Sequence, residues 1–296
     1  MKPPPFEYVA ATSLEEAVAA LGEHGDEAKL LAGGQSLVPL LAFRLARPGV
    51  LVDLNGVGGL DRLELAGDAL VVGAMARQRD VELLPGLRER CELIPEAIEL
   101  VGHVAIRNRG TVGGSLAHAD PAAEWPALAV LLDAELELVG PSGRRTVAAR
   151  DFFLSYFTTV LEPDEVLTEI RLPLPNGRSG SCFVELSRRH GDFALAGVGA
   201  LVTLAGDGTA AEVRLGLIGV GDRPVRPAAA EQALRGRVPD EGAIAAAAEA
   251  VAGEIEPTGD IHASEEYRRH LATVLTRRAL AAAVARAGGG EGAAAA

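Results

Sequence analysis

The stretch Gly110-Thr111-Val112-Gly113-Gly114-Ser115-Leu116-Ala117-His118-Ala119-Asp120-Pro121-Ala122-Ala123-Glu124 places a glycine pair beside hydroxyl side chains, and Ala32-Gly33-Gly34-Gln35-Ser36-Leu37 does the same earlier in the chain. Glycines let successive main-chain N–H groups converge on one point and let an anion come close. Ser and Thr hydroxyls add donors. One glycine pair is usually only a turn. Two pairs with matching chemistry, the second followed by acids that suit ribose hydroxyls, favour a dinucleotide.

The length, composition and net charge of the chain limit the functions that it can have. The chain has 296 residues, 48% hydrophobic and 23% charged, which is the composition of a globular protein with two or three domains. Its 28 basic and 41 acidic residues give a net charge of −13. This charge argues against nucleic acid or an anionic membrane as partner. An anionic cofactor must therefore be held by local donors.

The cysteines and the chain ends carry no further motif. Cys91 and Cys182 form neither a CxxC pattern nor a metal-binding spacing, so we expect core thiols in a reducing cytosol and no metal site. The N-terminal Met1-Lys2-Pro3-Pro4-Pro5 lacks the apolar core of a signal peptide. No apolar run reaches membrane-spanning length. The sequence thus predicts a cytoplasmic protein without a membrane span.

Residues 1–58 read as a β-α-β-α-β unit, with strands at 6–9, 28–32 and 51–54 and helices at 14–21 and from Ser36, as a possible N-cap, to about 46. This order places residues 33–36 at a helix N-terminus, where anions bind readily. Asp53 follows the glycines at the distance of a Rossmann ribose-binding acid. The Gly-Gly-Gln-Ser spacing, however, is neither GxGxxG nor a P-loop, so we interpret Asp53 as a strand-end residue.

Two further units follow. Residues 59–176 mix hairpins and helices around the second glycine segment, and Pro173 to Gly180 is the clearest linker. Residues 177–287 predict an antiparallel meander and then helices at roughly 227–235, 240–252 and 264–286, the last two capped by Asp240 and Ser264. Residues 288–296 are low-complexity and read as a disordered tail.

Several motifs in order resemble the FAD-binding medium subunit of molybdenum hydroxylases. They span nearly the whole chain, from Phe6 to about Arg286. The matching segments are Ala32-Gly33-Gly34-Gln35-Ser36-Leu37, His103-Val104-Ala105-Ile106-Arg107-Asn108-Arg109-Gly110-Thr111-Val112-Gly113-Gly114-Ser115, Ala119-Asp120-Pro121-Ala122-Ala123-Glu124, Arg188-Arg189-His190-Gly191-Asp192-Phe193-Ala194 and Ala263-Ser264-Glu265-Glu266-Tyr267-Arg268.

The resemblance implies an α+β fold: a vanillyl-alcohol-oxidase (PCMH)-type FAD-binding domain of two α/β subdomains, plus a C-terminal domain of antiparallel sheet and helices. It implies that the glycine segments hold the FAD diphosphate, that Asp120 and Glu124 contact ribose or ribityl hydroxyls, that Leu167 lies in a strand packing on adenine, and that Phe193 lies over the flavin ring. The cofactor-binding residues implied are Leu31, Ala32, Gly33, Gly34, Gln35, Ser36, Leu37, His103, Ile106, Gly110, Thr111, Gly113, Gly114, Ser115, Asp120, Glu124, Leu167 and Phe193.

Simpler interpretations stand beside these roles. Phe193 could be plain core, and His103 and His118 are more often hydrogen-bonded structural residues than proton shuttles. His190 reads as a solvated loop residue. Arg107 and Arg109 could reach phosphate, or equally face solvent or a partner. Many relatives carry a lysine where this chain has Val184 and Glu185; Arg188 or Arg189 could supply a cation near the flavin instead.

The resemblance implies that the reaction is divided among subunits. A molybdopterin-containing large subunit hydroxylates the substrate, a small subunit with two [2Fe-2S] clusters relays electrons, and this chain passes them through FAD to an external acceptor, in a heterohexamer. Two cysteines are too few for clusters of its own, and no side chain is required as a catalytic acid or base. The alternatives are a stand-alone FAD-dependent oxidase or dehydrogenase and a non-catalytic nucleotide-binding assembly subunit.

Overall fold

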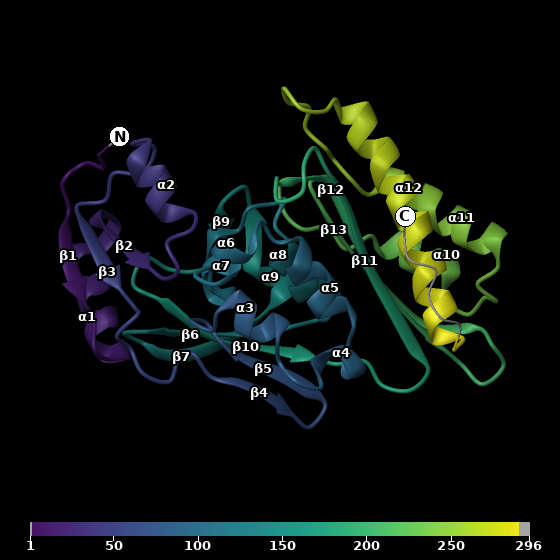
Figure 1. Ribbon diagram of the computed structural model, residues 1–296, viewed down its shortest axis with the longest axis horizontal. Coiled ribbons are helices and arrows are strands. Elements are labelled where there is room, and N and C mark those ends of the chain that lie inside the picture. Colours follow the sequence, from purple (N-terminus) through teal and green to yellow (C-terminus); the bar gives the residue numbers. More distant parts are fainter. Residues whose placement is uncertain (1, 290–296) are drawn as a thin grey trace.

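A small parallel sheet forms the N-terminal end of the molecule in the computed structural model, which describes residues 2–289 (Figure 1). Its strand order is β1-β3-β2, so the chain crosses over twice, as in a β-α-β-α-β unit. Helix α1 begins where the Ser13 hydroxyl accepts the Glu16 N–H, while the Glu16 carboxylate accepts the Thr12 N–H at 2.8 Å, a reciprocal cap. The bounds are β1 Glu7–Ala10, α1 Leu14–His24, a 3₁₀ turn Gly25–Glu27, β2 Ala28–Leu31, α2 Leu37–Ala42 and β3 Val50–Asp53.

Helix α2 is shorter than predicted. It ends at Ala42 rather than near residue 46, because Arg44 adopts a left-handed conformation (φ 60°) that no helix continues through. Ser36 is the N-cap residue, as predicted, but its side chain accepts no cap hydrogen bond. That hydroxyl is left for other partners.

A five-stranded antiparallel sheet, ordered β4-β5-β10-β6-β7, forms the middle of the molecule, with helices gathered on one side of it (Figure 1). Trp125 and Phe152 are fully buried in its core. The strands are β4 Leu63–Ala66, β5 Ala69–Gly73, β6 Glu135–Gly140, β7 Gly143–Ala148 and β10 Val166–Pro173, with a small pair β8 Phe153–Ser155 and β9 Thr158–Thr159. The helices are α3 Gln78–Glu82, α4 Leu87–Arg90, α5 Leu93–Leu100, α6 Val104–Arg107, α7 Val112–His118, α8 Glu124–Leu131 and α9 Ala149–Phe152.

The second glycine segment is the start of a helix and not the loop that the glycines suggest. Thr111 caps α7, its hydroxyl accepting the Gly114 N–H at 3.1 Å. The helix ends at Ala119, which takes a left-handed conformation (φ 52°). Two glycines inside a helix are unfavourable on propensity alone, so tertiary packing decides this structure.

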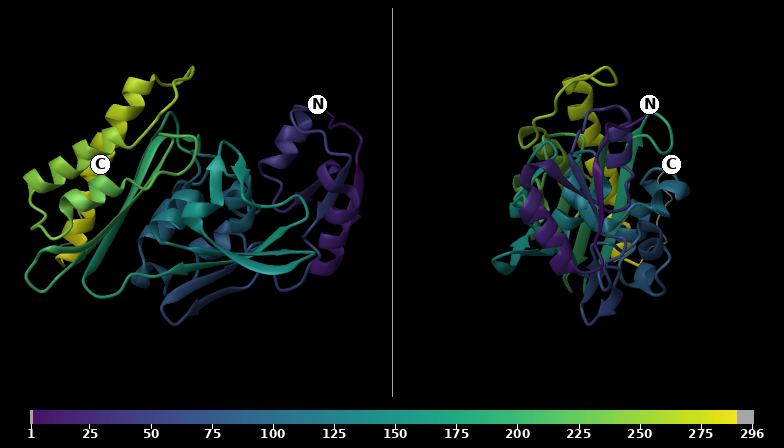
Figure 2. Two further views of the ribbon diagram at one scale, coloured as in Figure 1. Left: turned by 180° about the vertical axis from the view of Figure 1, so that it is seen from behind. Right: turned by 90° about the vertical axis from the view of Figure 1, so that its left-hand side faces the viewer.

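The C-terminal part is the predicted meander followed by helices. The sheet order is β11-β12-β13, all antiparallel, and α12 lies along it (Figures 1 and 2). Asp240 and Ser264 cap their helices as predicted, each accepting an N–H three residues on. The bounds are β11 Ser179–Ser187, β12 Ala194–Leu204, β13 Ala210–Ile218, α10 Ala228–Leu234, α11 Glu241–Ala250, a 3₁₀ turn Val251–Gly253 and α12 Glu265–Ala287. Most of the predicted tail lies outside the described residues.

Glycines let this sheet pack closely between helices on both faces. A Cβ on Gly216 would lie 2.8 Å from the carbonyl oxygen of Ala127 in α8, and one on Gly180 would lie 2.1 Å from the carbonyl oxygen of Ala283 in α12. Side chains of β11 and β12 therefore join the core of the middle part, as Phe183 and Leu201 do. The C-terminal sheet and the middle part share one packed core.

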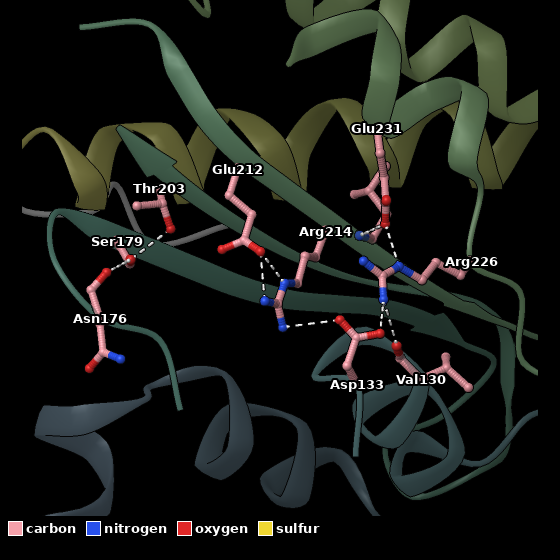
Figure 3. Close-up of polar contacts among 10 residues, drawn as sticks. Val130, Asp133, Asn176, Ser179, Thr203, Glu212, Arg214, Arg226 and Glu231 are labelled. Atoms are coloured by element: carbon pink, nitrogen blue, oxygen red, sulfur yellow. Dashed lines mark hydrogen bonds and ion pairs between the residues drawn. The ribbon is translucent and has the colours of Figure 1, made fainter. Parts of the chain in front are cut away.

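A polar cluster reinforces the same junction (Figure 3). Asp133, just after α8, pairs with Arg214 of β13 at 3.4 Å and with Arg226. Arg226 also donates to Glu231 at 2.8 Å, and Glu231 accepts the Leu215 N–H at 2.9 Å. Because both arginines are partly buried and all four charged groups are linked, they fix the orientation of the C-terminal sheet better than isolated surface pairs would.

Replacing Gly216 by alanine tests the close packing. We expect Gly216→Ala to lower the free energy of unfolding by about 1–3 kcal/mol, because the added methyl group meets the Ala127 carbonyl with no space to relax. Gly206→Ala, whose Cβ meets nothing within 4 Å, is the matched control and should be nearly neutral. Urea unfolding of the two variants makes the comparison, and equal stabilities would contradict it.

Candidate functional site

The two glycine segments meet, although 76 positions separate Gly33 and Arg109 (109 − 33). A Cβ on Gly33 would lie 2.2 Å from the Arg109 carbonyl oxygen, and one on Gly113 would lie 2.4 Å from the Ala74 side chain. Glycine is required at both positions by close approach, and not by a turn conformation. The first glycine turn is thereby held against the chain that leads into α7.

The first turn presents unpaired donors. Within residues 2–289, the main-chain N–H groups of Gly33, Gly34, Gln35 and Ser36 donate to no protein acceptor. Gly34 takes a left-handed conformation (φ 72°), and the Gln35 side chain braces the turn by donating to the Gly33 carbonyl at 3.1 Å. Successive N–H groups of this kind form an anion-binding nest. The donor set fits a phosphate.

Both glycine segments line one cavity of about 740 Å³. Its wall also includes residues of the middle part and a loop between β11 and β12. Sixteen of the eighteen residues expected to bind the cofactor lie in this wall: Ala32, Gly33, Gly34, Gln35, Ser36, Leu37, Ile106, Gly110, Thr111, Gly113, Gly114, Ser115, Asp120, Glu124, Leu167 and Phe193.

Two of the expected residues lie outside that wall. Leu31 lines a smaller neighbouring cavity, whose wall shares residues 32–35 with the larger one. His103 packs against Gly191, where an added Cβ would lie 2.4 Å from the imidazole ring. Its ring centroid is 5.8 Å from that of His190. His103 therefore supports the β11–β12 loop from behind.

Arg77 links the N-terminal and middle parts beneath the two segments. Its guanidinium donates to the Arg109 carbonyl and, at 2.7 Å, to the Asn55 side chain, and Asn55 in turn donates to the Ala32 carbonyl at 3.0 Å. Asp53 ends β3, as predicted, and takes part in this network. Burial raises the pKa of Asp53, but hydrogen bonds from Tyr8 and Asn55 outweigh it, so its pKa is lowered overall.

The wall is acidic where it lies near α8. Burial raises the pKa of Asp120, and burial together with the charge of Glu185 raises the pKa of Glu124 to about 8. Burial lowers the pKa of His118, whose ring lies 5.1 Å from that of Phe157. Within residues 2–289 neither His103 nor His118 has a ring hydrogen bond to the protein; both rings make packing contacts instead, His103 with His190 and His118 with Phe157.

Sequence reasoning missed part of the wall. His118 was read as structural, and Phe157, Thr158, Thr159 and Glu162 were not considered, although all line the cavity. No local signal marks the segment around β9. It reaches the cavity only because the Phe157 N–H donates to the carbonyl of Ala119, at the end of α7. That contact is tertiary.

Phe193 lies at the edge of the cavity on the β11–β12 loop. It is 66% exposed, so the interpretation of Phe193 as plain core is wrong. His190, on the same loop, is exposed as expected. Arg188 and Arg189 are exposed and do not line the cavity; Arg188 contacts His262 at 2.6 Å. The hypothesis that one of them brings a cation into the site therefore has no support.

The two arginines of the second motif differ. Arg107 is 5% exposed, pairs with Glu82 at 2.8 Å and donates to the Val101 carbonyl at 3.0 Å. Since Val101 lines the cavity, Arg107 holds the wall in place from behind and does not reach the cavity. The Arg109 side chain is exposed and lines the smaller cavity.

Residues 2–289 contain no group of three or more His, Cys, Asp or Glu side chains arranged to hold a metal ion. No helix in the same range has the length and hydrophobicity needed to cross a membrane. The site is therefore described by its cavity, its N–H donors and its acids.

Comparisons with known proteins agree along the whole chain. Residues 4–175 match the model of the FAD binding domain in molybdopterin dehydrogenase, and residues 181–283 match that of the CO dehydrogenase flavoprotein C-terminal domain. The chain is 40% identical to the 6-hydroxypseudooxynicotine dehydrogenase complex subunit alpha of Paenarthrobacter nicotinovorans, over 97% of each chain. It is 39% identical to the carbon monoxide dehydrogenase medium chain of Hydrogenophaga pseudoflava, over 97% of this chain and 99% of that one.

Solved structures give the same result. A chain of the Hydrogenophaga pseudoflava carbon monoxide dehydrogenase superposes with a TM-score of 0.94 at 41% identity, covering 97% of this chain and 99% of that chain. A chain of quinoline 2-oxidoreductase from Pseudomonas putida 86 superposes with a TM-score of 0.91 at 39% identity, with the same coverage.

Replacing Arg107 tests its supporting role. We expect Arg107→Ala to lower the free energy of unfolding by about 1–3 kcal/mol, because the buried Glu82 carboxylate loses one of its two arginine partners and keeps only Arg79, and the Val101 carbonyl loses its donor. Arg109→Ala removes an exposed side chain from the same motif and should change stability by no more than about 0.5 kcal/mol. Chemical denaturation of both variants checks this, and two equal losses would show that Arg107 is not the supporting residue.

Proposed function

Because the chain belongs to the family of FAD-binding medium subunits of molybdenum hydroxylases, we propose that it takes electrons from iron–sulfur clusters of a partner subunit and passes them through FAD to an external acceptor. The family fixes the coarser part: the chain is the FAD-carrying component of an oxidoreductase complex. FAD supplies the ability to take electrons singly and release them as a pair, while the protein binds and positions it.

The anion-binding nest is the observation that carries the proposal. In the proposed complex, the free N–H groups of residues 33–36 hold the diphosphate from one side. The hydroxyls of Thr111 and Ser115 hold it from the other. Asp120 and Glu124 take ribose or ribityl hydroxyls, Leu167 contacts the adenine, and Phe193 covers the flavin ring. Leu31 and His103, which lie outside the cavity wall, are not assigned a direct contact with FAD.

The partners in this proposal are a molybdopterin-containing large subunit and a small subunit with two [2Fe-2S] clusters, assembled as a heterohexamer in the cytoplasm. The cysteine content supports a separate cluster-bearing subunit. Cys91 and Cys182 are both buried free thiols, and burial raises the pKa of each to about 11, so neither is a ready thiolate ligand. Substrate hydroxylation takes place on the large subunit.

The three larger sheets support a division into FAD-binding subdomains 1–58 and 59–176 and a C-terminal domain 177–287. No strand pairs across the proposed boundaries, which fall between β3 and β4 and between β10 and β11. The cavity receives residues from all three parts. A cofactor bound there would contact each of them.

Replacing Gly33 tests the FAD site. The wild-type protein should absorb in the flavin bands and release intact FAD on denaturation, and dithionite should bleach it reversibly. Gly33→Ala should weaken FAD binding at least about tenfold, because the added methyl group overlaps the Arg109 carbonyl and displaces the N–H groups. The matched control is Gly58→Ala in the same subdomain, whose Cβ meets nothing within 4 Å.

Absorption titration of the apo-proteins with FAD makes this measurement. Equal affinities of Gly33→Ala and Gly58→Ala would contradict the placement of the diphosphate. A wild-type protein that takes up no FAD, alone or with its partner subunits, would contradict the function. Reduction by a substrate of its own, in the absence of any partner, would favour a stand-alone dehydrogenase instead.

A further inference from the structure

Two carboxyl groups from different parts of the fold lie at and behind the cavity wall: Glu124 is buried, and Glu185 is half-buried with its Oε2 atom fully buried. Glu124 is the first residue of α8 and lines the cavity, yet the residue is only 8% exposed. Glu185 lies on β11, two residues after Phe183, which packs in the core shared with α8. Alternation along a strand puts Glu185 on the same face as Phe183, towards α8. One acid thus reaches the cavity, and the other lies behind it.

Neither carboxyl group accepts a hydrogen bond from another residue of the described chain. The Oε2 atom of Glu185 is fully buried and makes no hydrogen bond, and no other residue of the described chain donates to the Glu124 side chain. A buried carboxylate without donors is unfavourable, and two side by side are more so. A proton on one of them supplies the O–H donor that the other lacks.

The surrounding charges do not remove this need. Asp120 adds a further negative charge, and Arg107, the cation that acts on Glu124, is already paired with Glu82. Strand β12, which lies beside Glu185, has no ionisable residue. Among the other elements against α8, α7 contributes His118, α5 contributes Glu96 and Glu99, α9 contributes Arg150 and Asp151, and β13 contributes Glu212 and Arg214. Glu96 is bound by Arg286, and Arg214 by Asp133 and Glu212.

We propose that Glu124 and Glu185 together hold one proton at neutral pH, and that this acid pair makes FAD binding depend on pH. The second part rests on the proposed function; the first concerns the chain alone. When the pair loses its proton, a further negative charge stands at the wall of a cavity that must receive a diphosphate. FAD binding and protonation of the pair therefore favour each other.

The direction of the effect follows from the pKa values. Burial raises the pKa of Glu185 to about 7, and burial with the Glu185 charge raises that of Glu124 to about 8. In the unfolded chain both carboxyl groups ionise at a pKa near 4.3. Between the pKa of the unfolded chain, near 4.3, and the folded values of about 7 and 8, the folded protein holds more protons than the unfolded chain. Its stability therefore falls as the pH rises towards 8. FAD affinity falls over the upper part of the same range.

The first experiment uses the FAD-free protein and is independent of the proposed function. The melting temperature is measured at pH 6 and pH 8.5 for the wild type, Glu185→Gln and Glu124→Gln. From pH 6 to pH 8.5, the melting temperature of each glutamine variant should fall less than that of the wild type. Glu135→Gln, an exposed strand glutamate outside the cavity wall, is the matched control and should keep the wild-type difference. Equal differences in all four proteins would overturn the acid pair.

The second experiment measures the dissociation constant of FAD by titration at the same pH values. Wild-type affinity should weaken about tenfold from pH 6 to pH 8.5, the size expected for one unit charge about 10 Å away at an effective dielectric constant of about 20. The FAD affinity of Glu185→Gln should weaken less than about threefold over the same pH range. Asp120 is present in both proteins. Tight binding that is independent of pH would overturn the coupling and leave the FAD site standing. No binding at either pH would overturn the proposed function, while the melting temperatures still decide whether the pair holds a proton.

Discussion

The close approach of Gly33 to the Arg109 carbonyl is the constraint on which the site depends. The turn after β2 and the segment between α6 and α7 can touch there because Gly33 has no side chain and meets only main-chain atoms of Arg109 and Gly110. The approach holds the free N–H groups of the first turn opposite the capped start of α7, and Arg77 and Asn55 link the two segments from below. Where the two segments meet, main-chain atoms and not side chains form the cavity wall. This leaves room for a dinucleotide.

The same device orients the C-terminal domain. Gly216 and Gly180 bring α8 and α12 onto opposite faces of one sheet, and the ion pairs of Asp133 fix the angle at which α8 meets it (Figure 3). Because α8 also begins with Glu124 at the cavity wall, the packing of the sheet determines where that acid lies. Glu185 lies on β11 of the same sheet, on the face that packs towards α8. The C-terminal domain thus completes the site without contributing a strand to either FAD-binding sheet.

Local chemistry explains which parts of the structure the sequence predicts. Caps at Asp240 and Ser264 and the alternation of the meander depend on neighbours within a few residues, and both are present. Helix α7 was missed because its glycines oppose helix formation, and packing against Ala74 outweighs them. The cavity wall around Phe157 and the facing of Glu124 and Glu185 depend on contacts between distant segments. His103 belongs to one of the matching motifs, but it supports the β11–β12 loop instead of lining the cavity. The spacing of residues in the sequence does not reveal this role.

The composition of the cavity wall has a consequence for ionic strength. Lys29 is the one lysine or arginine in that wall, beside Asp26, Asp120, Glu124, Glu162, Glu165 and Asp192. A phosphate site built on arginines loses affinity as salt screens its charges. Here the attraction comes from main-chain dipoles at hydrogen-bonding distance, where mobile ions cannot intervene, while the opposing acids are the groups that salt screens. Added salt should therefore leave the hold on an anionic cofactor intact or tighten it.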